Sequence, residues 1–255
     1  MPFQKVAPEK LSHSVVRQIE ELILRGILRP GERLPSERDL ADKLGVSRPS
    51  LREAIGDLAA AGWLVSRAGS GVFVAEVLGS AFSPALVRLF ASHEEAVFDY
   101  IAFRRDMEGL AAERAARLGS ETDLRVIETI FRKMEAAHQK RDPSDEAQLD
   151  AAFHMAIIEA SNNVIMLHML RSMFDLLREG VFYNRQVMFR NRMTREQLLD
   201  QHRAMNEAVQ ARDPVAARAA VEAHLTYVEQ AFVDQLRAEK HETIARQKLV
   251  QEESR

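Results

Sequence analysis

The sequence contains no cysteine, so this chain can form neither a disulfide bond nor a thiolate metal site. It also lacks any apolar run near the roughly 18 residues that a membrane-spanning helix needs. The opening residues, MPFQKVAPEK, do not include the apolar core of a signal peptide. From these absences we expect a cytoplasmic protein with no membrane partner. Its 46% hydrophobic and 29% charged residues are typical of a soluble globular protein.

Glycine and proline are scarce after the first third of the chain, and this divides the 255 residues into two parts. The net charge of -3 is divided unevenly between them. Residues 1–75 hold 11 Lys/Arg and 9 Asp/Glu, a balance of +2, whereas residues 76–255 hold 24 and 29, a balance of -5. The N-terminal part is therefore the better partner for an anion such as DNA.

The N-terminal part begins with the pattern of two helices. Residues 11–25 repeat apolar side chains at the period of an amphipathic helix. After a turn-rich connection, Ser36 followed by Asp39 forms a capping-box-like start for a short helix, SERDLADKL. Gly45 is expected to end this second helix.

A third helix and a hairpin follow the second helix. Ser47 can cap the third helix, Pro49 is tolerated in its first turn, and Gly62 ends it. Residues 63–75 contain two β-prone runs around a glycine-containing tip, which predicts a β-hairpin. This order of elements predicts a winged helix-turn-helix domain over residues 8–76. Its expected core consists of Leu40, Leu44, Val46, Leu51, Ile55, Leu58 and Trp63.

The rest of the chain predicts an all-α helical bundle, so the fold class is mainly α. We interpret residues 77–93 as a linker and residues 94–240 as one effector-binding and dimerisation domain, followed by a polar tail that frays. The expected helices cover residues 94–118, 121–140, 144–160, 163–178, 180–190, 194–211 and 214–240.

The third helix carries the candidate DNA-reading residues. Arg48 and Arg52 lie four residues apart near its start, so they share one face. Arginine suits a bidentate contact with guanine, and Ser47 and Ser50 can bond phosphates or bases. Two further sites are Arg38 on the second helix and the wing tip with Arg67 and Gly69. The alternative is that these arginines are ordinary solvated surface cations.

Four polar residues of the C-terminal part are candidate metal ligands. Asp150 and His154 lie four apart in an otherwise apolar helix, LDAAFHMAIIEA. His202 and His224 lie at similar distances on either side of the break at residues 212–214, so a helical hairpin would bring them to one height. Three imidazoles and a carboxylate suit Zn²⁺, Ni²⁺, Mn²⁺ or Fe²⁺. The alternative is separate histidines, each satisfied locally.

The segment RPGERLPSERDLADKLGVSRPSLREAIGDLAAAGWL resembles the winged-helix domain of the GntR family of bacterial transcription regulators. The resemblance covers about residues 8–75. It implies that DNA is contacted by the arginine of LPSER, both arginines of the third helix and the wing glycine. These are Arg38, Arg48, Arg52 and Gly69. Family members often have Thr-Thr after the first arginine of that helix, whereas this chain has Pro-Ser.

Residues 94–235 resemble the FCD effector domain of the FadR subfamily, through DAAFH, DQHRA and EAHLTYV in that order. This resemblance implies a metal held by Asp150, His154, His202 and His224. FRRDMEGLAAERAA is similar to an Arg-x3-Glu helix whose arginine faces the effector, which implies effector binding by Arg104. A plain ion pair between Arg104 and Glu108 is the alternative.

These patterns predict a transcription regulator, acting as a repressor, rather than an enzyme. We expect a homodimer on a pseudo-palindromic double-stranded DNA operator. Its effector would be a small carboxylate such as a 2-hydroxy or 2-keto acid, since the resemblance is to pyruvate- or lactate-responsive members. Two alternatives are a metal-dependent enzyme acting on a small hydroxy acid and a winged helix used only for protein contacts.

Overall fold

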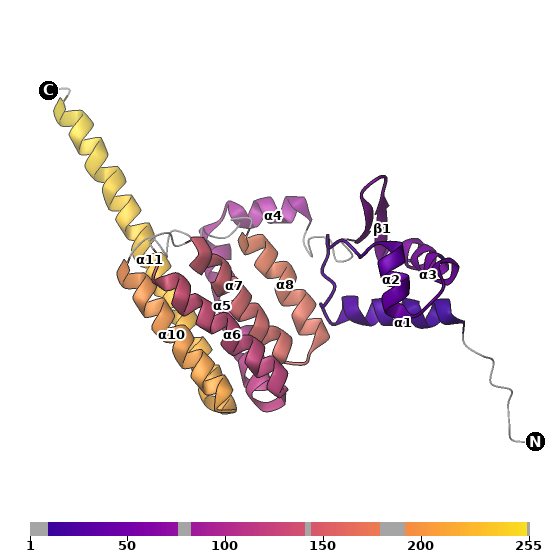
Figure 1. Ribbon diagram of the computed structural model, residues 1–255. Helices are drawn as coiled ribbons and strands as arrows, with labels where there is room; N and C mark the ends of the chain where they lie inside the picture. Colours follow the sequence, from indigo (N-terminus) through magenta and orange to yellow (C-terminus); the bar gives the residue numbers. More distant parts are fainter. Residues whose placement is uncertain (1–9, 76–82, 141–143, 179–191, 254–255) are drawn as a thin grey trace, which may run out of the picture. The chain divides into compact units, whose positions relative to one another are not determined.

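The computed structural model describes residues 10–75, 83–140, 144–178 and 192–253. The chain forms two compact units, Met1–Gly79 and Ser80–Arg255 (Figure 1). Each unit has its own hydrophobic core. Within the described residues, no helix has the length and apolar character that a bilayer crossing requires.

The N-terminal unit has the predicted winged helix-turn-helix order. Its elements are α1 (Leu11–Leu24), α2 (Glu37–Leu44), α3 (Arg48–Ala60), β1 (Leu64–Arg67) and β2 (Gly71–Val74). The two strands form an antiparallel hairpin in which Leu64 lies opposite Val74 and Arg67 opposite Gly71. The wing therefore follows directly from the helix that carries the candidate DNA-reading arginines.

Local capping explains where α2 and α3 begin. The Ser36 Oγ accepts a hydrogen bond from the Asp39 backbone N–H at 3.2 Å, which satisfies a free donor of the first turn. Gly45 ends α2 in the left-handed conformation, with φ of 65°. Ser47 then caps α3 by accepting from the Ser50 N–H at 3.3 Å, and Pro49 sits in the first turn. These predicted helix boundaries are confirmed.

The core of the N-terminal unit contains all seven expected residues at different depths. Leu51, Ile55 and Leu58 are buried, and the other four pack against them while remaining partly exposed: Leu40, Leu44, Val46 and Trp63. The apolar face of α1 and the inward side chains of the wing complete this core. Burying the α1 face fixes the base on which α3 is presented.

Every described element of the C-terminal unit is a helix, as predicted. The helices are α4 (Pro84–Ala91), α5 (Glu94–Leu118), α6 (Glu121–His138), α7 (Ser144–Ala160), α8 (Val164–Arg178), α10 (Arg192–Gln210) and α11 (Pro214–Glu253). The expected helix over residues 180–190 lies outside the described residues. Figure 1 shows α10 and α11 running side by side, next to α6 and α5 of the same unit.

Two segments differ from the sequence interpretation. The stretch 77–93, read as a linker, contains α4, because the Ser83 side chain accepts from the Leu86 N–H and Pro84 occupies the first helical position. This proline starts a helix rather than breaking one. The tail after Lys240 does not fray, since α11 continues to Glu253 with i,i+4 pairs such as Arg246 with Glu242 at 2.8 Å.

Small residues allow α5 to approach its neighbours closely. Ala111, Ala112, Ala115 and Ala116 are fully buried, and a Cβ added to Gly109 would lie 3.4 Å from the Arg218 Cγ of α11. The close packing of α5 against α7 and α11 brings polar residues of three helices into one interior region.

The single tryptophan, Trp63, packs against the core of the N-terminal unit and reports on that unit alone. We predict that Leu58→Ala lowers the unfolding free energy of this unit by about 2–5 kcal/mol, because Leu58 is 0% exposed. Urea titration followed by Trp63 fluorescence measures this change. Leu24→Ala, at a side chain 50% exposed, is the control and should leave the transition nearly unmoved.

Candidate metal centre and nucleic-acid interface

The C-terminal unit brings all four predicted metal ligands together. Asp150 and His154 come from α7, His202 from α10 and His224 from α11, and all four are buried. One nitrogen or oxygen atom of each residue lies within 4.8 Å of the others. The His202 Nε2 is 3.0 Å from the Asp150 Oδ1 and 3.3 Å from the His154 Nε2.

The helical hairpin of α10 and α11 accounts for this convergence. Its turn contains Arg212 with φ of 54°, and the Asp213 side chain accepts from two N–H groups in the first turn of α11. His202 and His224 lie at similar distances from this turn, and their ring centroids are 4.5 Å apart. The sequence interpretation of a hairpin with two imidazoles at one height agrees with this geometry.

The outer ring nitrogens of two histidines contact acceptors away from the cluster. The His154 Nδ1 lies 2.6 Å from the Glu108 Oε2, and the His224 Nδ1 lies 3.0 Å from the Gln201 Oε1. The His202 Nδ1 has no hydrogen-bond partner among the described residues. The Nε2 atoms of His154 and His224 are therefore left for the cluster.

Burial keeps these imidazoles in the form that binds metals. It lowers the pKa of His154 below the ordinary value of 6.5, although the Glu108 carboxylate opposes the shift. Burial, together with the neighbouring His202 and His154, lowers the pKa of His224 well below 6.5. Both rings are neutral near pH 7, so each can offer a lone pair to a cation.

The chemistry of this donor set fits a divalent transition-metal ion. Three imidazole nitrogens and one carboxylate oxygen are borderline ligands of the kind that such ions prefer. Aromatic rings enclose the cluster: Phe153 meets His202 edge to face at 5.5 Å, and Phe174 lies 6.1 Å from His154. An ion held by these four residues would supply positive charge in the interior of the helical unit.

Arg104 lies beside this cluster and is itself buried, with 1% of its surface exposed. Its Nε donates to the Glu108 Oε1 at 2.5 Å, so the ion pair that the sequence offered as the alternative to effector binding is present. Its guanidinium carbon lies 4.8 Å from the Phe174 ring centre. Burial alone would raise the pKa of Glu108, but the Arg104 charge and the hydrogen bonds of Arg104 and His154 lower it to about 2.

Two neighbours of the metal ligands were missed by sequence reasoning. Glu108 had been paired only with Arg104, and nothing in its spacing indicated that it also contacts His154 on α7. Gln201 adjoins His202 in the sequence but contacts His224 on the next helix. Both contacts depend on how α5 packs against α7 and how α10 packs against α11, so the Arg-x3-Glu spacing was the only available signal.

The candidate DNA-reading residues of α3 lie at its N-terminal end. Arg48 and Arg52 have exposed side chains, while Ser47 and Ser50 join their hydroxyl groups at 2.9 Å. Both arginines reach one carboxylate oxygen of Glu37 on α2, at 2.7 Å for Arg52 and 3.9 Å for Arg48. Sequence reasoning did not single out Glu37. The two arginines are four residues apart, so both lie on the side of α3 that faces Glu37.

The other three candidates occupy α2 and the wing. Arg38 is exposed in the first turn of α2, 3.7 Å from Asp39. Arg67 ends β1 and stacks over the Phe73 ring at 4.4 Å. Gly69 forms the wing tip with φ of 69°, a conformation that favours glycine. The structure thus exposes the basic side chains on α2, α3 and the wing.

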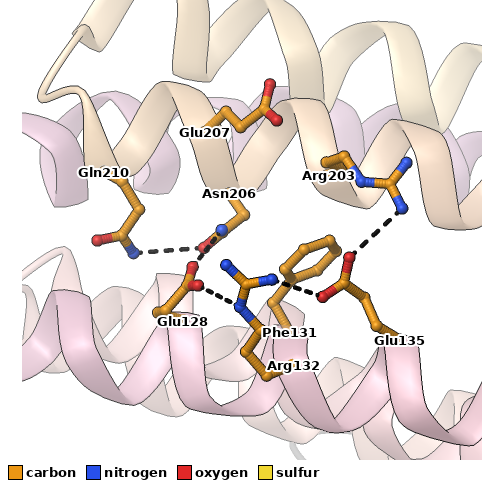
Figure 2. A pocket seen from close by; sticks show the side chains of 8 residues that line it. All are labelled: Glu128, Phe131, Arg132, Glu135, Arg203, Asn206, Glu207 and Gln210. Carbon is orange, nitrogen blue, oxygen red and sulfur yellow. Dashed lines mark hydrogen bonds and ion pairs between the residues drawn. The ribbon is translucent and has the colours of Figure 1, made fainter.

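A separate polar groove of about 410 Å³ lies between α6 and α10 (Figure 2). It contains none of the four metal-ligand candidates. Its charged side chains pair with one another, as in the contacts of Arg132 with Glu128 at 2.6 Å and with Glu135 at 3.0 Å. The remaining lining residues are Phe131, Arg203, Asn206, Glu207 and Gln210. The buried cluster and this surface groove are therefore distinct sites.

A winged helix-turn-helix in one chain with an all-α domain that encloses ligand-type side chains is the architecture of a DNA-binding transcription regulator. Comparison with known families agrees. Residues 11–74 match the pattern described as bacterial regulatory proteins, gntR family, and residues 99–227 match the FCD domain. The chain belongs to the GntR family, with a C-terminal FCD domain of the FadR type, as the sequence predicted.

Relatives over most of the chain are also regulators. The chain is 37% identical to a protein assigned as the L-lactate dehydrogenase operon regulatory protein of Escherichia coli K12, covering 88% of this chain and 86% of that protein. It is 34% identical to the Glc operon transcriptional activator of the same organism, covering 86% and 88%. A solved GntR structure from Streptococcus agalactiae is 25% identical, with a TM-score of 0.52 over 86% of this chain and 99% of that one. These relatives are transcription regulators and not enzymes. This protein is likewise a transcription regulator.

The lowered histidine pKa values predict how stability depends on pH. An unfolded histidine takes up a proton below about 6.5, whereas buried His154 and His224 do not, so protonation favours unfolding. The Glu108 contribution is lost only as the pH falls below about 4.5 and towards 2. With a chelator present to remove metal ions, the melting temperature should therefore drop by several degrees between pH 7.5 and pH 5.5. Circular dichroism measures this drop. The variant His224→Gln should show a smaller drop, because it lacks one of the two buried imidazoles. An equal drop in the variant would contradict the contribution assigned to His224.

Proposed function

We propose that this protein is a cytoplasmic homodimeric repressor whose operator binding is controlled by a small carboxylate bound at a metal in the FCD domain. The observation that carries the proposal is the convergence of one carboxylate and three imidazoles inside the helical unit. Such a buried polar cluster is costly unless a cation compensates its lone pairs. The winged helix-turn-helix gives the chain its DNA-binding function.

The four residues Asp150, His154, His202 and His224 would hold the ion, and Zn²⁺ is the proposed metal because imidazole suits it; Ni²⁺, Mn²⁺ and Fe²⁺ are the other candidates. Bound metal would supply positive charge for a carboxylate. Arg104, beside the cluster, would pair with the same anion. We infer a 2-hydroxy or 2-keto acid, with lactate and pyruvate as first choices, because of the lactate-operon relative.

The proposed DNA contacts lie on α3 and its neighbours. Arg48 and Arg52 would reach base edges in the major groove from the N-terminal turns of α3, with Ser47 and Ser50 at phosphates or bases. Arg38 would contact DNA from α2, and the wing tip with Arg67 and Gly69 would enter the minor groove. One recognition helix per chain makes a homodimer on a pseudo-palindromic operator the natural arrangement.

Control by the effector requires that the two sites be coupled. We propose that the carboxylate releases the operator, by favouring an arrangement of the dimer with lower DNA affinity. One relative is named an activator, so the sign of the response is tested with a reporter gene placed behind the operator. Higher expression on addition of the carboxylate supports repression, and lower expression contradicts it.

Metal binding is tested by thermal unfolding with and without added ions. A saturating ion, at about 100 times its Kd, should raise the melting temperature by about 5–10 °C. His202→Ala should abolish this rise, because it removes a nitrogen at the centre of the cluster. His241→Ala, at an exposed histidine elsewhere on α11, is the matched control and should keep it. Equal shifts in both variants contradict the metal site.

DNA reading is tested with a duplex selected by the protein from a random-sequence library. Arg48→Ala should weaken binding of this duplex by about 5- to 150-fold, the loss typical of one base contact. Arg25→Ala, an exposed arginine after α1, is the control. Fluorescence anisotropy measures both. Unchanged affinity in Arg48→Ala would instead favour a winged helix that serves protein contacts.

A further inference from the structure

A continuous buried chain of polar contacts joins α5 to the metal-ligand cluster. Arg104 and Glu108 are one helical turn apart on α5, and Glu108 crosses to His154 on α7. The three side chains are 1%, 2% and 1% exposed. Within this chain each Glu108 oxygen has a partner, since Oε1 accepts from the Arg104 Nε at 2.5 Å and Oε2 lies 2.6 Å from the His154 Nδ1.

This geometry determines where the proton of the His154 ring must be. A carboxylate beside a guanidinium has only acceptor atoms to offer, so the ring must donate from Nδ1. The lone pair of the ring is then on Nε2, which lies 3.3 Å from the His202 Nε2. His154 is thus set in the tautomer that a metal ion at the cluster would require.

The other two histidines of the cluster lack a charged acceptor at Nδ1, the nitrogen that faces away from the cluster. The His224 Nδ1 contacts Gln201, a neutral amide, at 3.0 Å. The His202 Nδ1 has no hydrogen-bond partner in the described part of the chain. A charged acceptor fixes a ring more firmly and makes its other nitrogen a stronger donor to a metal. Glu108 therefore gives His154 a support that the structure gives to neither of the other imidazoles.

We propose that Glu108 is a positioning residue of the metal centre, which fixes His154 as the Nδ1–H tautomer and presets its Nε2 for the ion. Arg104 orients Glu108 in turn, through the Nε contact and a second contact from its Nη2 to Oε2 at 3.4 Å. The inference rests on the proposed metal function, but the tautomer belongs to the protein before any metal binds. It assigns Glu108 a role beyond the ion pair with Arg104.

The tautomer is tested directly on the metal-free full-length protein. Histidine side chains labelled with ¹⁵N give different nitrogen shifts and proton couplings for the two tautomers, and comparison with His154→Gln assigns the His154 signal. The expected result is a proton held on Nδ1. A proton on Nε2, or rapid averaging between the nitrogens, overturns the proposal whether or not the protein binds metal.

The effect on affinity is tested by chelator competition with Zn²⁺. Glu108→Gln should weaken Zn²⁺ binding by about 10- to 100-fold, as is typical for a partner of a metal-bound histidine. Glu113→Gln, on the same helix and paired with exposed Arg218, is the matched control and should bind like the wild type. If the wild type itself binds no Zn²⁺, the proposed metal function fails; if the wild type and Glu108→Gln bind equally, only the present inference fails.

Glu108→Gln leaves the buried Arg104 charge without a carboxylate, which threatens folding. The double variant Arg104→Met with Glu108→Gln removes both charges and avoids this difficulty. Its fold is checked by circular dichroism. A folded double variant should still bind Zn²⁺ about 10- to 100-fold more weakly than the wild type. Wild-type affinity in this variant overturns the proposal.

Discussion

The C-terminal unit depends on keeping four polar side chains inside an apolar helical bundle. Asp150, His154, His202 and His224 come from three helices, and each would be better solvated in water. The helices meet in one register, where the acceptors Glu108 and Gln201 lie within hydrogen-bond distance of His154 and His224 and lower the cost of burying them. The small residues of α5 serve the same end, since they let α7 and α11 approach closely enough to place these contacts.

The N-terminal unit is subject to a different constraint: its arginine side chains must be exposed to solvent and still be oriented. Capping by Ser47 places Arg48 and Arg52 in the first turns of α3, and Glu37 holds both guanidinium groups from α2. In the wing, the guanidinium group of Arg67 is likewise oriented by a neighbour, since it stacks over the Phe73 ring. A surface built this way is charged but partly ordered, so less side-chain freedom is lost when an anion binds.

Much of this architecture could be predicted from local sequence signals. Ser36, Gly45 and Ser47 mark helix ends through hydrogen bonds to neighbouring residues, so the sequence alone locates α2 and α3. The grouping of Asp150, His154, His202 and His224 was predictable because i,i+4 spacing and the hairpin place these residues, with family resemblance supplying the rest. The Glu108 and Gln201 contacts were not, because they join helices whose relative rotation is set by packing. The interpretation of residues 77–93 as a linker missed α4, which begins at Pro84, because a proline can occupy the first position of a helix.

The hairpin of α10 and α11 also fixes the position of His202 relative to His224. His202 and His224 face each other because each lies a fixed number of residues from the turn at Arg212 and Asp213. One inserted residue between either histidine and the turn rotates that imidazole by about 100° around its helix. Insertions within this interval would therefore separate the two imidazoles, whereas lengthening of the turn itself leaves both spacings intact. The number of residues between each histidine and the turn is thus constrained as strictly as the identity of the histidines themselves.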